Sequence, residues 1–348
     1  MSAGLPISLC MIVRNEEAFL DASLKSAKTV LGLRDIVVVD TGSTDSSKDI
    51  AFAHGARVCD FEWCDDFSAA RNFSSDRASN DWIFYLDADE EVTEADTKKL
   101  HEFITDARNV GVGTMIELTN LAAHPVSRLY NRKQYIFKGI IHEQIEPIGS
   151  FIKVLKDIPV TLIHHGYLPD VSKAKNTHER NTRMLREALK KKPNDPYLLY
   201  KLGNAYYYKD METACDYLKK ALDNVNDLKF LYVYEAVECY GYALINTGQY
   251  KKALALRNEY TANYGAKPQF RFLEAHIFQN NGMFLEAVQS YESCIGADIV
   301  DYMGITSFLS YYNIGVILEC VGMLDDAVEF YKKCGGYEPA VRRLAELE

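Results

Sequence analysis

The first half of the chain alternates between short apolar runs and amphipathic stretches. Ile7–Val13 and Asp35–Asp40 are nearly continuous apolar runs, typical of strands covered on both faces. Ala56–Asp60 is a shorter run, and Trp82–Glu90 is an aromatic one. Apolar residues between the runs recur at helical spacing, as from Phe19 to Ala27. This alternation predicts βαβ units and a mostly parallel sheet.

The pattern after Glu90 is less regular. A polar helix is predicted after Thr93, running to about Ala107, and strands are predicted at Val112–Leu118 and Val160–Ile163. The polar stretch between these two strands shows no clear period, so we expect irregular structure there.

The second half is helical and repetitive. A basic helical pattern runs from Asn176 to Lys192 and stops at Pro193. Similar six-residue units then begin at positions 209, 248, 282 and 322, so they are offset by 39, 34 and 40 residues. Thirty-four residues is the period of tetratricopeptide repeats. We therefore predict roughly four helical hairpins in a short solenoid.

The two halves predict an α/β, Rossmann-like domain followed by an all-α repeat domain. The expected boundaries are 1–170 for the first domain, 171–194 for a connecting helix and 195–348 for the repeats. Seven tyrosines of the repeats are expected to pack in the core and groove: Tyr206, Tyr207, Tyr208, Tyr232, Tyr234, Tyr240 and Tyr242. The alternative is a concave surface that binds a peptide or forms a dimer contact.

Composition excludes several classes of protein. The net charge of −10 over 348 residues argues against non-specific nucleic-acid binding. The eight cysteines form no Cys-x-x-Cys pair and no zinc spacing, which is typical of a reducing compartment. Residues 1–6 have no basic signal region, and Ile7–Val13 is too short to cross a bilayer. We expect a cytoplasmic protein with no membrane span.

The clearest candidate chemistry is the Asp-x-Asp at the end of Trp82–Glu90. Asp87 and Asp89 would face one site, because alternate residues of an extended chain project to the same side. Ligands bind beyond the carboxyl ends of strands in open α/β sheets. Two converging carboxylates favour Mg²⁺ or Mn²⁺, commonly shared with a substrate phosphate. The alternative is a strand that ends in solvated acids.

Polar residues follow the other predicted strands at the same edge of the sheet. Asn15 and Glu16 follow the first strand, and Asp40 and Ser43 belong to the end of the second. This shared edge favours a binding site over scattered surface acids. The glycines form neither a dinucleotide-binding fingerprint nor a P-loop.

Three further features each have two interpretations. His164 is either a core histidine or a metal ligand, and its place after a strand favours a ligand of an Mn²⁺-type site. Arg128 and Arg132 are either surface charges or part of the site. His142 and Glu143 are either a surface pair at a turn or catalytic groups.

Four motifs occur in order within the first 90 residues: Met11–Glu17, Val39–Asp45, Asp66–Asn72 and Leu86–Glu90. Together they resemble the inverting family-2 glycosyltransferases of GT-A fold. Phe137–Glu143, His164–Tyr167 and Ser172–Arg183 extend the resemblance. With the helical repeats, the chain is similar to bacterial family-2 enzymes that carry tetratricopeptide repeats. Among these it is similar to the sublancin-type S-glycosyltransferases that make glycocins.

This resemblance implies a UDP-sugar donor, a divalent cation (Mg²⁺ or Mn²⁺) and a role for each candidate residue. The metal ligands would be Asp87, Asp89 and His164. The nucleotide-sugar site would contain Val13, Asn15, Glu16, Asp40, Ser43, Arg71, Asp87, Ala88, Lys175 and Arg180. Asp40 would accept a hydrogen bond from the uracil ring. Lys175, Arg180 or Arg183 would neutralise the departing diphosphate.

An inverting transfer needs a base on the acceptor side and charge stabilisation on the leaving group. Glu143 stands where the family places its base, commonly an aspartate, and His142 is the second candidate. The resemblance implies transfer of a hexose, glucose from UDP-glucose, to a cysteine of a bacteriocin precursor peptide, with serine as the alternative residue. The repeats would dock that peptide or form a homodimer contact. The alternatives are the same chemistry on a flagellin, a surface protein or a cell-envelope glycan, and an inactive repeat scaffold.

Overall fold

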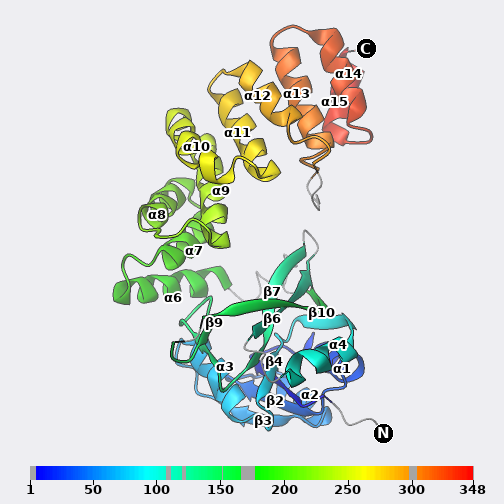
Figure 1. Ribbon diagram of the computed structural model, residues 1–348, viewed down its shortest axis with the longest axis vertical. Coiled ribbons are helices and arrows are strands. Elements are labelled where there is room, and N and C mark those ends of the chain that lie inside the picture. The colour runs from blue at the N-terminus through cyan, green and yellow to red at the C-terminus, as the bar shows by residue number, and fades with distance from the viewer. Residues whose placement is uncertain are drawn as a thin grey trace. The chain divides into compact units, whose positions relative to one another are not determined.

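The computed structural model describes residues 5–106, 111–119, 123–150, 152–165, 177–297 and 304–347. The chain divides into two compact units, 1–184 and 185–348, and each is described by itself. The first unit is mixed α/β and the second is helical (Figure 1), as the sequence predicts. The sequence-based boundaries at 170 and 195 stay predictions.

An eight-stranded sheet forms the centre of the first unit, with strand order β3-β2-β1-β4-β7-β6-β10-β5. Its strands are β1 (Ile7–Val13), β2 (Asp35–Asp40), β3 (Arg57–Asp60), β4 (Trp82–Tyr85), β5 (Glu90–Ala95), β6 (Gly111–Leu118), β7 (Ala123–Asn131) and β10 (Val154–His164). A separate hairpin pairs β8 (Tyr135–Lys138) with β9 (Gln144–Pro147). The helices that begin in this unit are α1 (Leu20–Val30), α2 (Ser47–Ala53), α3 (Phe67–Asp76), α4 (Thr97–Thr105) and α6 (Thr177–Lys191).

Strand direction determines where the functional side chains can gather. β1 pairs in parallel with β2 and β4, and β6 pairs in parallel with β10. β7 is antiparallel to both β4 and β6, so these two strands run the same way. The carboxyl ends of β1, β2, β4, β6 and β10 therefore meet at one edge of the sheet.

Each face of the sheet is covered by a different layer. Leu24 of α1 and Leu100 of α4 pack with Leu9 and other buried residues on one face. Tyr85 and Phe137 belong to the core on the other face, where α3 and the β8–β9 hairpin lie. Figure 1 shows the sheet between α3 and the helices α1 and α4.

The predicted strand Trp82–Glu90 and the predicted start of the helix after Thr93 are both wrong, because neither prediction includes the strand β5. Trp82–Glu90 is not one strand, because β4 ends at Tyr85 and Glu90 begins β5. Thr93 lies in β5, and α4 begins only at Thr97, after Asp96 caps it by accepting a hydrogen bond from the Lys99 amide. β5 pairs with β10, about 70 residues away in the chain, and such a partner is invisible in a local pattern. The polar stretch expected to be irregular likewise forms β7, β8 and β9.

The β8–β9 hairpin is attached to α3 by a pair of hydrogen bonds. Nδ2 of Asn72 donates to the Phe137 carbonyl at 2.9 Å, and its Oδ1 accepts from the Phe137 amide at 3.0 Å. The Phe67 amide donates to the Ile140 carbonyl at 2.9 Å. These bonds hold the turn at 139–143 against the first half of α3.

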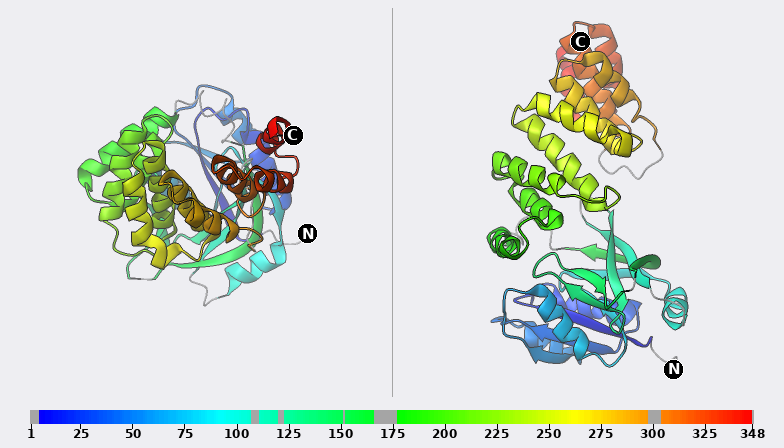
Figure 2. Two further views of the ribbon diagram at one scale, coloured as in Figure 1. Left: turned by 90° about the horizontal axis from the view of Figure 1, so that it is seen from above. Right: turned by 60° about the vertical axis from the view of Figure 1, so that its left-hand side comes forward.

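The second unit consists of successive helical hairpins (Figure 2). Its helices are α7 (Pro196–Tyr206), α8 (Met211–Asp223), α9 (Leu231–Asn246), α10 (Tyr250–Tyr264), α11 (Pro268–Asn280), α12 (Phe284–Glu292), α13 (Phe308–Cys320), α14 (Leu324–Lys333) and α15 (Glu338–Leu347). The second helix of each of the four pairs α7–α8, α9–α10, α11–α12 and α13–α14 carries a fully buried alanine at the same position: Ala214, Ala253, Ala287 and Ala327. The repeat pattern of the sequence is thus confirmed in the packing.

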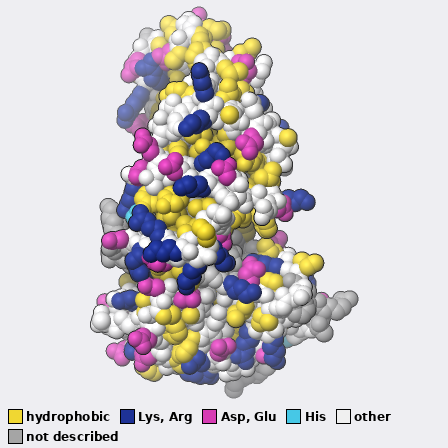
Figure 3. Space-filling view, turned by 90° about the vertical axis from the view of Figure 1, so that its left-hand side faces the viewer, with side chains coloured by type: hydrophobic (Ala, Val, Ile, Leu, Met, Phe, Trp, Pro, Cys, Tyr) yellow, Lys and Arg dark blue, Asp and Glu magenta, His cyan; other side chains and the backbone are white. Residues whose placement is uncertain are grey.

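Most of the tyrosines named above pack inside this unit. Tyr234 and Tyr240 are buried, whereas Tyr208 is 91% exposed. In the described part of the chain, no helix combines the length and apolar character that a membrane crossing requires. On the face drawn in Figure 3, basic and acidic side chains are interspersed with hydrophobic ones.

Replacing Asn72 by alanine should destabilise the first unit. Both backbone groups of Phe137 would lose their side-chain partner, so the free energy of unfolding should fall by about 1–3 kcal/mol. The two tryptophans, Trp63 and Trp82, both lie in this unit, so urea unfolding followed by tryptophan fluorescence reports on it alone. Thr105→Ala, an exposed change on α4, should stay within about 0.5 kcal/mol of wild type. Equal stability of the two variants would show that the hydrogen bonds between Asn72 and Phe137 do not stabilise the first unit.

Candidate active site

The loops after β1 and β2 are joined by hydrogen bonds that involve three predicted residues. The Asn15 amide donates to Ser43 Oγ at 3.0 Å, and Asn15 Oδ1 accepts from the Thr44 amide at 2.8 Å. The Glu16 amide donates to Ser47 Oγ at 2.8 Å. Asn15 has a φ of 56°, a left-handed conformation that asparagine tolerates better than most residues. The two loops therefore form one rigid rim.

Asp40 is buried at the foot of this rim, with 1% of its surface exposed. Its carboxylate accepts hydrogen bonds from the Gly42 and Ser43 amides, at 3.1 and 3.0 Å. Lys48 Nζ lies 3.6 Å from the same carboxylate. Val13 is also buried, and its carbonyl accepts from the Thr41 amide at 3.0 Å.

The Asp-x-Asp lies in a turn, so the prediction that Asp87 and Asp89 project together from a strand is wrong. The Glu90 amide donates to the Asp87 carbonyl at 3.1 Å, and Ala88 between them is buried. The two carboxylates meet different partners as a result. Asp87 lies 3.1 Å from Arg71 Nη1 and 3.2 Å from Arg128 Nη2, whereas Asp89 lies 3.4 Å from His164 Nε2.

Arg71 connects the Asp-x-Asp with the motif Phe137–Glu143. Its guanidinium lies over the Tyr85 ring, 3.8 Å from the centroid, and binds both Asp87 and Glu143. Burial acts to lower the pKa of Arg71, but the charges of Asp87 and Glu143 raise it above its usual range. The side chain of Glu143 is only 8% exposed, so the surface-pair interpretation is wrong for Glu143.

His142 precedes Glu143 in the turn between β8 and β9. Its φ is 50°, and its carbonyl accepts a hydrogen bond from Gln144 Nε2 at 3.2 Å. This backbone conformation places two candidate bases in sequence on a turn that Asn72 and Phe67 hold to α3.

A second arginine, Arg128, forms ion pairs with Asp87 and with two further carboxylates. Arg128 is 15% exposed and pairs with Glu90, with Asp87 and, at 3.4 Å, with Glu117. The surface-charge interpretation is therefore wrong for Arg128. Strand pairing joins Gly113 to Leu129 and Thr114 to Ser127, so it skips Arg128. Such bulges re-aim side chains.

His164 completes the cluster at the end of β10. Its Nε2 faces Asp89, and its Nδ1 lies 3.5 Å from Glu117 and 3.9 Å from Glu90. Among the described residues, Glu90, Glu117 and His164 form the one group whose ligand atoms all lie within 4.8 Å of one another. Only His164 of these three belongs to the predicted metal set.

Burial and charge set the protonation of this cluster. Burial raises the pKa of Glu90 to about 8. Burial also opposes ionisation of Glu117, but hydrogen bonds with His164 and Glu90 lower its pKa to about 2. Burial acts to lower the pKa of His164, and its bonds with Asp89 and Glu117 raise it to about 10. The cluster is therefore an environment that favours positive charge.

The basic residues predicted to meet the diphosphate lie on α6 or just before it. The Arg180 guanidinium lies 5.2 Å from the Phe67 ring centroid, and burial together with the charge of Arg14 lowers its pKa. Arg183 pairs with Asp65 at 2.7 Å, and this bond lowers the pKa of Asp65 to about 2. Lys175 lies outside the described residues.

The structure thus brings Arg71, Asp87, Asp89, Glu143 and His164 into one cluster. The sequence analysis does not assign Glu90 and Glu117 to the site. Glu90 ends the motif Trp82–Glu90, and Glu117 lies in the strand predicted at Val112–Leu118. The sequence signal for Glu117 is its place near the carboxyl end of that strand.

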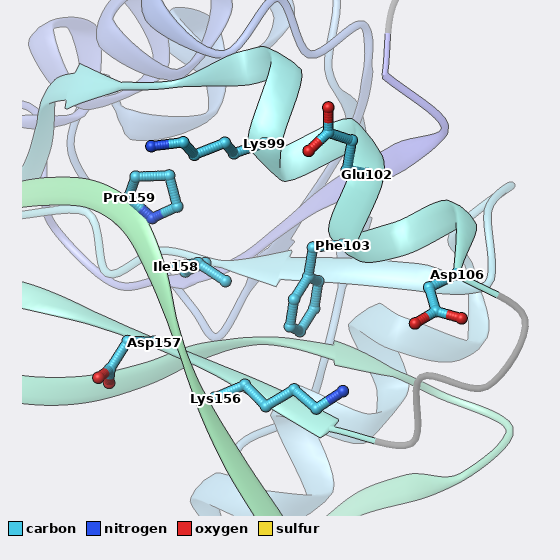
Figure 4. Close-up of a pocket in the computed structure, with 8 residues that line it drawn as sticks. All are labelled: Lys99, Glu102, Phe103, Asp106, Lys156, Asp157, Ile158 and Pro159. Carbon is cyan, nitrogen blue, oxygen red and sulfur yellow. The ribbon is translucent and has the colours of Figure 1, made fainter.

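A pocket of about 250 Å³ lies elsewhere in the first unit, between α4 and β10 (Figure 4). Phe103 and Ile158 line it, together with Lys99, Lys156 and several acids. None of the predicted site residues lines this pocket.

Sequence comparisons agree with the geometry. Residues 8–158 match the model of glycosyl transferase family 2, and residues 309–340 match a tetratricopeptide repeat model. A TPR repeat-containing protein of Synechococcus elongatus is 34% identical over 235 residues, 64% of this chain and 57% of the relative. The SPbeta prophage-derived glycosyltransferase SunS of Bacillus subtilis is 27% identical over 233 residues, 63% of this chain and 53% of the relative. The chain thus spans little more than half the length of these relatives.

Solved structures show weaker likeness. Glucosyl-3-phosphoglycerate synthase of Mycobacterium tuberculosis, in complex with Mn²⁺, uridine-diphosphate and phosphoglyceric acid, is 21% identical with a TM-score of 0.26. It covers 33% of this chain, and the match covers 43% of the synthase. MamA is 22% identical with a TM-score of 0.39, over 51% of this chain and 96% of MamA. At these TM-scores neither likeness carries an argument.

The matched family model spans β1 to the start of β10, which is the sheet that carries the cluster around Arg71. The first unit is therefore a GT-A-like α/β domain that matches glycosyl transferase family 2, and the second unit contains a match to the tetratricopeptide repeat.

Proposed function

We propose that this chain transfers a hexose, with inversion, from a UDP-sugar to a cysteine or serine side chain of a peptide. The observation that carries the proposal is the position of Arg71, which binds Asp87 of the Asp-x-Asp and Glu143 of the acceptor-side motif at once. A donor bound beside Asp87 would thus present its anomeric carbon near Glu143. Membership in family 2 supports the reaction class, and the motif resemblance to glycocin enzymes supports the peptide acceptor.

The rim formed by Asn15, Ser43 and Asp40 would hold the nucleoside. Its hydrogen bonds fix these groups before a ligand arrives, which reduces the entropy lost on binding. Arg180 lies over Phe67, and the charge of Glu16 acts on it, so it is placed to meet the diphosphate from the α6 side. The charge of Arg183 is already compensated by Asp65.

The charges of the cluster fit a divalent cation. With Glu90 protonated, the carboxylates of Asp87, Glu117 and Glu143 pair with the guanidinium groups of Arg71 and Arg128, and the carboxylate of Asp89 faces His164. Two negative charges remain when His164 is neutral, and one divalent cation balances them. Asp89 and His164 Nε2 would hold it, and it would stabilise charge on the departing diphosphate.

Glu143 would take the proton from the acceptor, and His142 is the alternative base. The ion pair with Arg71 holds the Glu143 carboxylate in place without using both of its oxygens. A thiol needs less help than a hydroxyl, because a few per cent of it is thiolate at neutral pH.

Asp89→Ala should remove metal-dependent catalysis while the domain stays folded. We expect transfer and UDP-sugar hydrolysis to fall by about 10²–10³-fold, and EDTA to have a similar effect on wild type. Rates are measured by UDP release, with circular dichroism as the check on folding. Glu94→Ala, an exposed change on β5, should leave the rate unchanged. Full activity of Asp89→Ala would rule out the metal role.

Glu143→Gln should separate the two acceptors. With a serine peptide the rate should fall by about 10²–10⁴-fold, whereas the matched cysteine peptide should lose much less. Single-turnover rates on the two peptides provide the measurement, and His142→Ala is the parallel variant. An unimpaired rate on serine with Glu143→Gln, together with a large loss with His142→Ala, would transfer the role of base to His142.

Intact-mass analysis tests the function as a whole. Peptides that differ only by Cys, Ser or Ala at one position are incubated with a panel of nucleotide sugars. We expect a gain of one hexose on the Cys peptide with a UDP-sugar, a smaller gain on Ser and none on Ala. Transfer to none of the peptides, alongside active UDP-sugar hydrolysis, would redirect the search to a glycan acceptor.

A further inference from the structure

A different carboxylate faces each nitrogen of the His164 imidazole. Nε2 lies 3.4 Å from Asp89, the predicted metal ligand, and Nδ1 lies 3.5 Å from Oε2 of Glu117. A neutral imidazole can donate from one nitrogen and ligate from the other, so its two neighbours decide which nitrogen does which.

We propose that Glu117 is a positioning residue for the metal site, which accepts the Nδ1 proton of His164 and thereby presents the Nε2 lone pair beside Asp89. The proposal rests on the proposed function, because it assumes that Asp89 and His164 hold the cation. Carboxylates in this position fix the tautomer and ring orientation of metal-bound histidines and increase their basicity as ligands.

The surroundings of Glu117 suit this role. Its side chain is 5% exposed and lies near the end of β6, the strand that pairs in parallel with β10 at Leu162 and Ile163. Arg128 Nη2 lies 3.4 Å from its Oε1, whereas Oε2 faces His164. One oxygen is thus held by the guanidinium and the other is directed at the imidazole.

Glu90 is the competing acceptor, and the distances favour Glu117. Oε1 of Glu90 is 3.9 Å from Nδ1, and Arg128 binds that same oxygen. The other oxygen of Glu90 accepts from the Asp87 amide at 2.9 Å. Both oxygens of Glu90 are therefore engaged with groups other than the histidine.

The neighbouring histidine provides a matched control. His165 Nε2 lies 2.9 Å from Oε1 of Glu91, so a second histidine–glutamate pair is formed by a residue of β5 and the residue directly after β10. Among the ion pairs of the described residues, none joins the side chain of His165 or Glu91 to Asp89. Removal of the Glu91 carboxylate should leave the metal site unchanged.

Calorimetric titration of Mn²⁺ alone into the metal-stripped full chain tests the proposal. Glu117→Gln should weaken Mn²⁺ binding about 10–100-fold, and Glu91→Gln should stay within about twofold of wild type. Asp89→Asn is included to test the metal site itself separately from the role of Glu117. If Asp89→Asn binds Mn²⁺ as wild type does, the proposed metal site itself fails. If Asp89→Asn loses Mn²⁺ binding but Glu117→Gln binds Mn²⁺ as wild type does, the metal site stands and the role of Glu117 is overturned.

A second measurement uses wild-type protein, so it tests the proposal even if Glu117→Gln fails to fold. In wild-type protein labelled with ¹⁵N-histidine and loaded with Mg²⁺, the His164 signals are assigned by their loss in His164→Gln. We expect a proton on Nδ1 and none on Nε2. A proton on Nε2 would overturn the proposal, whatever the stability of the variants.

Discussion

The site depends on charge compensation by two arginines, of which Arg71 is buried and Arg128 is largely buried. Arg71 and Arg128 both reach Asp87, and between them they also bind Glu90, Glu117 and Glu143. Carboxylates this close and this buried cannot all stay ionised without such partners, because burial penalises each charge. Removing either guanidinium would therefore disturb several of these carboxylates at once. In the proposed function, the two arginines would allow a metal site, a leaving-group site and a base to share one small cluster.

The sheet supplies the rest of the arrangement. The carboxyl ends of six strands (β1, β2, β3, β4, β6 and β10) lie at the same edge of the sheet. β7 runs against them, so Arg128 enters the cluster from the middle of a strand and not from a loop. The skipped position in the pairing of β7 with β6 coincides with Arg128. Functional residues from sequence-distant segments can meet here because strand pairing, and not the local chain, sets their separation.

Much of this was predictable from sequence, and the limits have physical causes. β1 and β2 matched their predicted bounds because strands covered on both faces leave continuous apolar runs. The repeats were predictable because each unit repeats the same buried alanine. β5 was missed because its partner β10 is distant in the chain. The divergence of Asp87 and Asp89 depends on a turn that an apolar run conceals. Glu117 and Arg128 became visible only when pairing placed them beside His164.

Asn72 and Arg71 are consecutive residues of α3, and their joint effect extends beyond stability. Asn72 holds the backbone of the β8–β9 hairpin, while Arg71 holds the Glu143 side chain and Asp87. The separation of Asp87 from Glu143, the proposed base, is thus fixed by one turn of one helix. A change in chain length beyond β9, which ends at Pro147, would leave these bonds in place. The connection from the hairpin to β10 can therefore vary in length without moving Glu143 relative to Asp87.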